Sequence, residues 1–208
     1  IPAAMVTLAI GAIGVLASRR LLDLACFAAV ASMGTLLIAI GLFDEVGVTA
    51  ALYYLVHSTV AGAALFLLVD LIAIRRGKAR DTLSAAAPFP RDYVYGALFF
   101  LAAIATVGLP PLSGFLGKLL LLDATMTTPH AAAIWTVVLG SSFLMLVGFS
   151  RAGSVLFWKS AAQPAPAAQE DVRRRAVPTL AAATLIGATV LLSVLAAPVS
   201  RALGETAH

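Results

Sequence analysis

The stretch Gly108-Leu-Pro-Pro-Leu-Ser-Gly-Phe-Leu-Gly-Lys118 lies inside an apolar run from about Tyr93 to Thr125. Pro110 and Pro111 donate no backbone hydrogen bonds, and their rings clash with carbonyl groups four residues earlier. They therefore predict a break or a kink in a membrane-spanning helix. Lys118 follows by about two turns, where an ammonium group inside a bilayer costs roughly 2.5–3.5 kcal/mol. A broken helix with an intramembrane lysine is typical of a route for ions or protons.

The composition indicates a helical membrane protein. Of the 208 residues, 61% are hydrophobic and 12% are charged, and a soluble domain has about twice that charged fraction. The apolar residues form runs of about 20, without the alternation of a barrel strand. Cys26 is the only cysteine, which excludes a disulfide framework or a cysteine metal cluster within the chain. The net charge of +4 arises from basic loops and gives no indication of nucleic-acid binding.

The apolar runs predict an all-α fold: a polytopic transmembrane bundle of about six spans that includes broken helices. The predicted spans cover about 2–17, 21–43, 48–74, 93–125, 131–157 and 177–199. The third, fourth and fifth exceed the ~20 residues that cross a bilayer, which predicts tilt or interruption. We divide the chain into a core of five spans (1–157), a Pro/Ala-rich cytoplasmic linker (158–176), and a final helix with an outer tail (177–208).

The charged loops predict the orientation of the bundle. Lys and Arg residues follow the first, third and fifth spans, at residues 19–20, 75–91, 159 and 173–175. The intervening loops, which include 44–45 and 127–130, contain neither. By the positive-inside rule, the basic loops face the cytoplasm. We therefore expect the C-terminus on the outer or periplasmic side of the cytoplasmic membrane.

Two ionisable residues are predicted at similar depth near the membrane centre. His57 lies about nine residues into the third span, roughly 13 Å, and Lys118 about eight residues from the outer end of the fourth, roughly 12 Å. Since histidine exchanges protons near neutral pH, we interpret the two as a proton relay. The alternatives are that His57 only hydrogen-bonds a neighbouring helix, and that the ammonium group of Lys118 extends to the outer headgroups.

Other polar residues are candidates for supporting roles. Ser58 and Thr59 directly follow His57 and are expected to bond to free carbonyl groups or to hold water. Asp123 lies near the outer surface, where it is either part of an exit for protons or cations or a solvated helix end. Gly114 belongs to the same predicted helix break as the two prolines.

Other segments have structural interpretations. Gly140-Ser-Ser is interpreted as a group of small residues that favours close helix packing. Asp23 is expected to pair with Arg19 or Arg20. The sequence has no phosphate-binding glycine loop, no metal-spaced histidines and no paired carboxylates. It therefore predicts no catalytic residue, metal site or cofactor, so that coupling to ATP or redox chemistry would come from another chain.

Several segments resemble the antiporter-like proton-pumping subunits of respiratory complex I and Mrp antiporters. Gly108 to Lys118 resembles the broken helix near the C-terminal end of these subunits, and Leu52 to Leu68 resembles the preceding broken helix with its central histidine. Together with Leu24 to Gly34 and Arg151-Ala-Gly-Ser-Val-Leu-Phe-Trp158, they look most like the D subunit of the Mrp-type multisubunit cation/proton antiporters. The resemblance covers essentially the whole chain. It implies the C-terminal half of a protein of about fourteen spans, and the first residue, Ile1, also predicts a start inside a longer polypeptide.

The resemblance also implies roles for single residues. Lys118 matches the terminal charged residue of the central hydrophilic axis, which stores and releases a proton near the outward half-channel. His57 matches the histidine of the neighbouring broken helix. Some relatives carry a lysine at or near Gly62. This chain does not, which leaves His57 as the ionisable candidate in the middle of this helix. The glutamate–lysine pair of the family belongs to the N-terminal half.

These observations predict a secondary transporter that couples inward proton movement to export of Na+ or another monovalent cation such as K+. The expected partners are other hydrophobic subunits of an antiporter complex, the N-terminal half of the same subunit, and the lipid bilayer of a bacterial inner membrane. One alternative is a proton-pumping membrane subunit of a quinone- or ferredoxin-coupled oxidoreductase. Another is a membrane scaffold without ion traffic.

Overall fold

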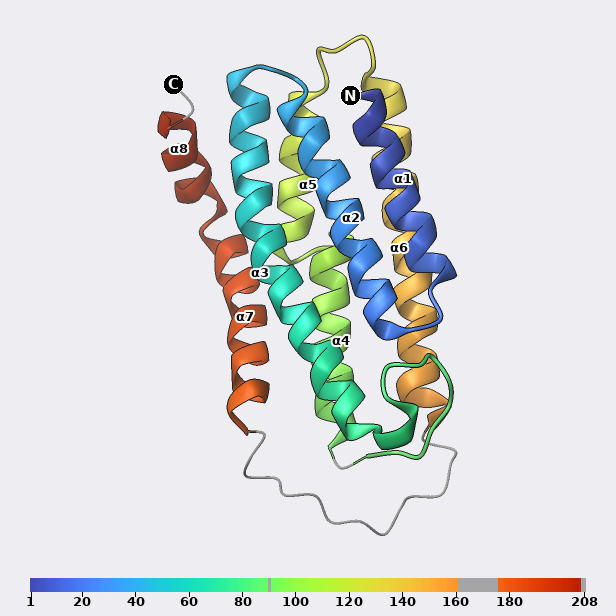
Figure 1. The fold of residues 1–208 in the computed structure, drawn as a ribbon. Coiled ribbons are helices and arrows are strands. Elements are labelled where there is room, and N and C mark those ends of the chain that lie inside the picture. The colour runs from blue at the N-terminus through green and yellow to red at the C-terminus, as the bar shows by residue number, and fades with distance from the viewer. Residues whose placement is uncertain (90, 161–175, 207–208) are drawn as a thin grey trace.

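The computed structural model describes residues 1–89, 91–160 and 176–206. Almost all of these residues are helical, and none of them belongs to a β-strand. Figure 1 shows the bundle, whose helices in chain order are α1 (Pro2–Ala17), α2 (Leu21–Ile40), α3 (Glu45–Arg75), α4 (Asp92–Val107), α5 (Ser113–Ala124), α6 (Ala131–Gly153), α7 (Ala176–Val194) and α8 (Ala196–Thr206). A short 3-10 turn, Gly77–Ala79, follows α3, and a π-helical turn, Ser154–Trp158, extends α6.

The predicted all-α transmembrane bundle is confirmed. Within the described residues, α2, α3, α7 and α6 with its π-helical turn are long and apolar enough to cross a membrane, and α1 and α4 are shorter apolar helices. The predicted fourth span consists of α4 and α5, which follow each other along the bundle (Figure 1). The predicted sixth span is also divided, because α7 ends at Val194 and α8 begins at Ala196.

Helix α3 runs without interruption from Glu45 to Arg75. The break that the resemblance implies for the third span is therefore wrong. The physical reason is local: the segment contains no proline, so every backbone N–H group is available for the helical ladder. Gly62 weakens a helix by roughly 1 kcal/mol relative to alanine but does not end it.

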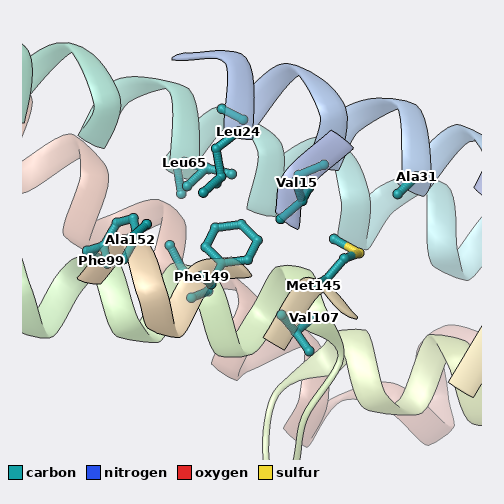
Figure 2. Packing of buried hydrophobic residues seen from close by; sticks show 14 of the residues in the cluster. Val15, Leu24, Ala31, Leu65, Phe99, Val107, Met145, Phe149 and Ala152 are labelled. Atoms are coloured by element: carbon teal, nitrogen blue, oxygen red, sulfur yellow. The ribbon is translucent and has the colours of Figure 1, made fainter. Parts of the chain in front are cut away.

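The core of the bundle lies between α1, α2 and α3 on one side and α4 and α6 on the other. Phe149 of α6 is fully buried, and its ring centroid lies 6.0 Å from that of Phe99 in α4. Figure 2 shows Phe149 with Leu24 and Leu65 of the facing helices, and all belong to one cluster of buried apolar residues. Because lipid is as apolar as these side chains, van der Waals packing holds the helices together.

Close packing of α1 against α6 depends on a glycine that the sequence analysis did not single out. A Cβ atom at Gly148 would lie 2.8 Å from Cγ1 of Val15, so a larger residue would force the two helices apart. At Gly140, in contrast, nothing lies within 4 Å of the position of a Cβ atom. The packing role predicted for Gly140 is therefore wrong, because Gly140 lies on the outward side of α6, whereas the next residue, Ser141, is buried.

The turns rich in Arg and Lys gather at one end of the bundle, the lower end in Figure 1. There, Nε of Arg20 donates a hydrogen bond to Oδ2 of Asp81 at 3.0 Å. The hydrogen bond and the charge of Asp81 raise the pKa of Arg20, and Asp23 contributes a smaller attraction. The ion pair of Arg20 is therefore formed with Asp81 instead of the predicted Asp23.

Arg76 organises the segment that follows α3. Its guanidinium group donates hydrogen bonds to the carbonyl oxygens of Arg80, Thr82 and Ser84. The backbone N–H of Leu21 in turn donates to the carbonyl oxygen of Asp81 at 2.6 Å. These bonds satisfy backbone groups at the start of α2 and connect the α1–α2 turn to the α3–α4 loop.

Helix α7 packs along α3, with further contacts to α4 and α5, and lies at the side of the bundle (Figure 1). Side-chain hydrogen bonds help to attach it: the hydroxyl groups of Tyr95 and Thr179 lie 2.7 Å apart, and the Tyr53 hydroxyl donates to the carbonyl oxygen of Leu192 at 3.2 Å. Most of the predicted linker, residues 161–175, lies outside the described residues. The division of the chain at residues 157 and 176 stays a prediction.

Candidate functional site

The break predicted in the fourth span is confirmed, and a glycine ends α4. Gly108 adopts the left-handed conformation, with φ of 80°. Its N–H donates to the carbonyl oxygen of Ala105 at 3.2 Å, and the N–H of Leu109 donates to that of Ile104 at 3.0 Å. This bonding pattern is common at helix C-termini, where glycine accepts the positive φ without strain.

The two prolines lie in the turn that follows. The peptide bond between Pro110 and Pro111 is cis, and α5 begins at Ser113, which is fully buried. Proline is unable to continue the helical ladder of α4, because it lacks the N–H group. The prolines thus keep α4 and α5 separate, while Gly108 forms the end of α4.

Gly114 permits three helices to meet at the break. A Cβ atom at this position would collide with the carbonyl oxygen of Ala105 and would lie 2.8 Å from Nε2 of His57. The start of α5 therefore approaches the end of α4 and the middle of α3 more closely than any larger residue would allow. The structure provides a physical reason for a glycine here.

Lys118 is buried beside the break, with 7% of its surface exposed. Its Nζ atom donates hydrogen bonds to the carbonyl oxygen of Val107 and to Oγ of Ser142, both at 2.7 Å. The Val107 carbonyl belongs to the last residue of α4, where the helix dipole favours a positive charge. The ammonium group is directed into the bundle, so the alternative in which it extends to the outer headgroups does not describe this structure.

Ser142 was missed by the sequence analysis as a partner of Lys118. Its hydroxyl group donates to the carbonyl oxygen of Val138 in the same helix at 2.9 Å and accepts from the lysine. Its depth in the membrane could have indicated this role, because Ser142 lies about eleven residues into the predicted fifth span, roughly 17 Å. That depth is near the predicted depths of Lys118 and His57.

His57 lies on the other side of the break. It is 2% exposed, and its Nδ1 atom lies 2.8 Å from Oγ of Ser113, the first residue of α5. The ring of Tyr54 packs against it, with 5.7 Å between the ring centroids. The structure thus brings His57 and Lys118 to the same break, as their predicted depths suggested, but each has its own hydrogen-bond partners.

A cavity of about 80 Å³ opens beside His57, between α2, α3 and the end of α4. A cavity of this size has room for several water molecules. The hydroxyl groups of Ser58 and Thr59 both donate to the carbonyl oxygen of Leu55 within α3. Other hydroxyl-bearing residues that line the cavity are Ser32 and Thr106. The water-holding role of Ser58 and Thr59 stays a prediction.

Asp123 is not part of this arrangement. It is exposed in the last turn of α5 and lines a separate cavity of about 260 Å³ together with Glu45, Thr49 and Gly204. None of the residues that line this cavity belongs to the break. Among the residues that the structure describes, no group of three His, Cys, Asp or Glu side chains is arranged to hold a metal ion.

Comparison with known sequences gives consistent matches. Residues 1–145 match the family model described as NADH:quinone oxidoreductase/Mrp antiporter, TM. The chain is 34% identical to the D subunit of a probable K+/H+ antiporter of Rhizobium meliloti, over 98% of this chain and 42% of that protein. It is 30% identical to the D subunit of the Na+/H+ antiporter of Bacillus subtilis, over 74% of this chain and 31% of that protein.

Solved structures share the fold. A chain of the Mrp complex from Dietzia sp. DQ12-45-1b gives a TM-score of 0.80 at 24% identity, over 98% of this chain and 45% of that chain. A chain of respiratory complex I from Thermus thermophilus gives a TM-score of 0.64 at 24% identity, over 99% of this chain and 44% of that chain. The present chain spans less than half the length of these relatives. The predicted resemblance to the D subunit of Mrp-type antiporters is confirmed, and the chain belongs to the NADH:quinone oxidoreductase/Mrp antiporter transmembrane family.

Proposed function

We propose that this chain forms part of the proton path of a cation/proton antiporter subunit, with Lys118 as the proton-storing base and His57 as a relay. The observation that carries the proposal is the environment of the buried ammonium group. Its two hydrogen bonds go to neutral oxygen atoms, the Val107 carbonyl and the Ser142 hydroxyl. The break that creates this environment also provides a hydrogen-bond partner for His57, at Ser113.

Neutral partners suit a group that has to gain and lose a proton. A buried carboxylate would hold the lysine in its charged form, because separating a buried ion pair costs several kcal/mol. A hydrogen bond from a charged group to a neutral acceptor contributes about 1.5–3 kcal/mol. Two such bonds are comparable with the roughly 2.5–3.5 kcal/mol cost of placing a lysine inside the membrane. The two bonds therefore offset the cost of burying the charge, and the ammonium form is held without a carboxylate partner.

The surroundings of His57 support the proposed relay role. Its Nδ1 atom contacts the Ser113 hydroxyl, and its side chain also borders the cavity lined by Ser58 and Thr59. An imidazole is able to accept a proton on one ring nitrogen and release it from the other. Both ring nitrogens lie near the start of α5, Nδ1 at Ser113 and Nε2 beside Gly114, so we expect a proton that reaches the ring from the cavity side to pass to this end of the break and on towards Lys118.

Transport by the whole subunit is part of the same proposal. Inward movement of protons is coupled to export of K+ or Na+, the cations that appear in the names of the Rhizobium and Bacillus relatives. The basic end of the bundle faces the cytoplasm of a bacterial inner membrane, and the C-terminus lies outside. The remaining part of the subunit and other hydrophobic subunits complete the path.

A redox-driven proton pump is the second candidate, because the complex I chain shares the fold. The names of the curated relatives favour the antiporter. The two functions differ in their energy source. Everted vesicles containing the complete complex should form a ΔpH on addition of K+ or Na+ without an electron donor if the chain belongs to an antiporter. Formation of ΔpH only with an electron donor would support the pump.

The proposed role of Lys118 is tested by Lys118→Ala in the full-length subunit of the assembled complex. We expect loss of cation-dependent ΔpH formation with normal assembly. Lys78→Ala is the matched control, because Lys78 is exposed at the basic end of the bundle, and it should leave transport unchanged. Full transport by Lys118→Ala would overturn the proposal and favour a scaffold.

A further inference from the structure

We infer that Ser142 is a positioning residue for proton storage: its hydroxyl group holds the charged form of Lys118 against the end of α4. The inference rests on the proposed role of Lys118. It assigns part of the proton site to α6, a helix that is distant in sequence from the break. The contact joins Ser142 Oγ and Lys118 Nζ at 2.7 Å, across 24 residues of sequence.

The hydroxyl group of Ser142 has a defined direction. It donates its hydrogen to the carbonyl oxygen of Val138, one turn earlier in α6, at 2.9 Å. A hydroxyl group has one donor and two acceptor lone pairs, so this bond leaves only acceptor capacity for the lysine. Ser142 therefore stabilises the ammonium form, which has hydrogens to donate and a charge that strengthens the bond.

The second acceptor has a fixed position as well. The Val107 carbonyl is at the end of α4, and the hydrogen bonds of Gly108 and Leu109 go to earlier carbonyl groups. Val107 therefore remains available to Lys118. The ammonium group lies between an acceptor from α4 and an acceptor from α6, and each of these is held by a helix. Without the Ser142 hydroxyl, the ammonium group keeps one of its two hydrogen bonds, the one to the Val107 carbonyl.

The position of Ser142 is maintained by contacts farther along α6. The backbone of α6 lies close to α1 at Gly148, and the guanidinium group of Arg151 donates to the carbonyl oxygen of Ser18 at 2.5 Å. These contacts fix α6 to α1 on the side of Ser142 that is nearer the basic end. The acceptor of the lysine is thus carried by a helix that is anchored independently of the break.

A serine in the middle of a helix often bonds only to its own backbone, and Thr136 provides that comparison within α6. Its hydroxyl group donates to the carbonyl oxygen of Ala132 at 2.8 Å, as Ser142 does to Val138, but it is exposed and has no contact with Lys118. The Thr136→Ala variant therefore loses the same type of backbone bond without affecting the ammonium group.

The test measures cation-dependent ΔpH formation as a function of pH in vesicles that contain the complete complex. Ser142→Ala should move the alkaline limb of the profile to lower pH by about one unit, because the ammonium form loses an acceptor. Ser142→Thr, which retains the hydroxyl, should restore the original profile, and Thr136→Ala should not change it. Ser142→Cys, with a weak acceptor of similar size, should give an intermediate shift and replaces the alanine variant if that one fails to assemble.

An unchanged pH profile in Ser142→Ala, or a lower amplitude without a shift, would overturn the inference and leave a structural role for the serine. A failure of this inference can be distinguished from a failure of the proposed function. If Lys118→Ala abolishes transport while the Ser142 variants keep the original profile, the lysine stores the proton without help from α6. If Lys118→Ala transports normally, the proposed function itself is wrong.

Discussion

The Nζ atom of Lys118 in α5 lies 2.7 Å from the carbonyl oxygen of Val107 in α4, eleven residues earlier in the chain. The lysine thus caps the C-terminus of a helix other than its own. Because helix ends leave carbonyl groups without intrahelical partners, the break creates both the acceptor and the need for a donor. The broken helix and the intramembrane lysine form one structural unit.

Gly108→Ala should destabilise this unit. Alanine in the left-handed conformation costs about 1–2 kcal/mol, and a Cβ atom would lie 2.9 Å from Cδ of Lys118. We expect a lower thermal unfolding midpoint of the purified subunit and weaker transport, because the lysine side chain has to move. Gly140→Ala is the control, since it adds a methyl group to an exposed helical site with open space. Equal midpoints for the two variants would contradict this prediction.

Gly114→Ala should be more damaging than Gly108→Ala. Its methyl group would collide with the backbone oxygen of Ala105, which moves only if α4 and α5 separate, and overpacking of this kind costs typically about 1–3 kcal/mol. Gly62→Ala on α3 meets nothing within 4 Å and should be neutral or stabilising by about 0.5–1 kcal/mol. Yield and thermal stability of the assembled complex distinguish the two. Normal assembly of Gly114→Ala would argue against the close contact.

His57→Gln should separate the relay role of the histidine from its packing role. The glutamine amide is able to bond to the Ser113 hydroxyl but does not carry a proton at neutral pH. We expect normal assembly and a decrease of about 100-fold in the initial rate of ΔpH formation, the lower end of the effect of a positioned proton-transfer group. A rate near that of the unmodified protein would show that His57 only stabilises the bundle.

The orientation of the bundle is testable with cysteine labelling. After Cys26→Ala, a cysteine introduced at Lys78 should react with a membrane-impermeant maleimide in everted vesicles and remain protected in right-side-out vesicles. A cysteine introduced at Thr127, in the loop at the opposite end, should show the reverse pattern. Identical patterns at the two positions would contradict the orientation that the basic loops predict.

Those parts of the fold that depend on local chemistry were predictable from the sequence. Two adjacent prolines are incompatible with a continuous helix, and α4 and α5 are indeed separate. The gathering of basic residues at one end followed from their alternation along the chain. The expectation of a broken third span came from resemblance instead, and it failed because the segment around His57 contains no residue that ends a helix.

The partners within the site were harder to predict, because they depend on how helices are rotated against one another. Ser113 and Ser142 are ordinary serines in apolar segments, and no local pattern shows that they face His57 and Lys118. The role of Gly108 was also missed, since the more conspicuous prolines follow it by two residues. Every residue has a backbone carbonyl, so the residue types do not indicate which one, such as that of Val107, accepts a hydrogen bond.

The unbroken α3 has a consequence for the lipid that surrounds the protein. The segment between Glu45 and Asp70 contains no Asp, Glu, Lys or Arg, and its residues 46–69 extend roughly 36 Å as a helix. A hydrocarbon layer of about 30 Å accommodates that length through a tilt of roughly 30°. A thinner bilayer requires a steeper tilt of α3, whereas α5, with 12 residues, is roughly 18 Å long and does not cross the hydrocarbon layer. Bilayer thickness therefore affects the alignment of His57 with Ser113.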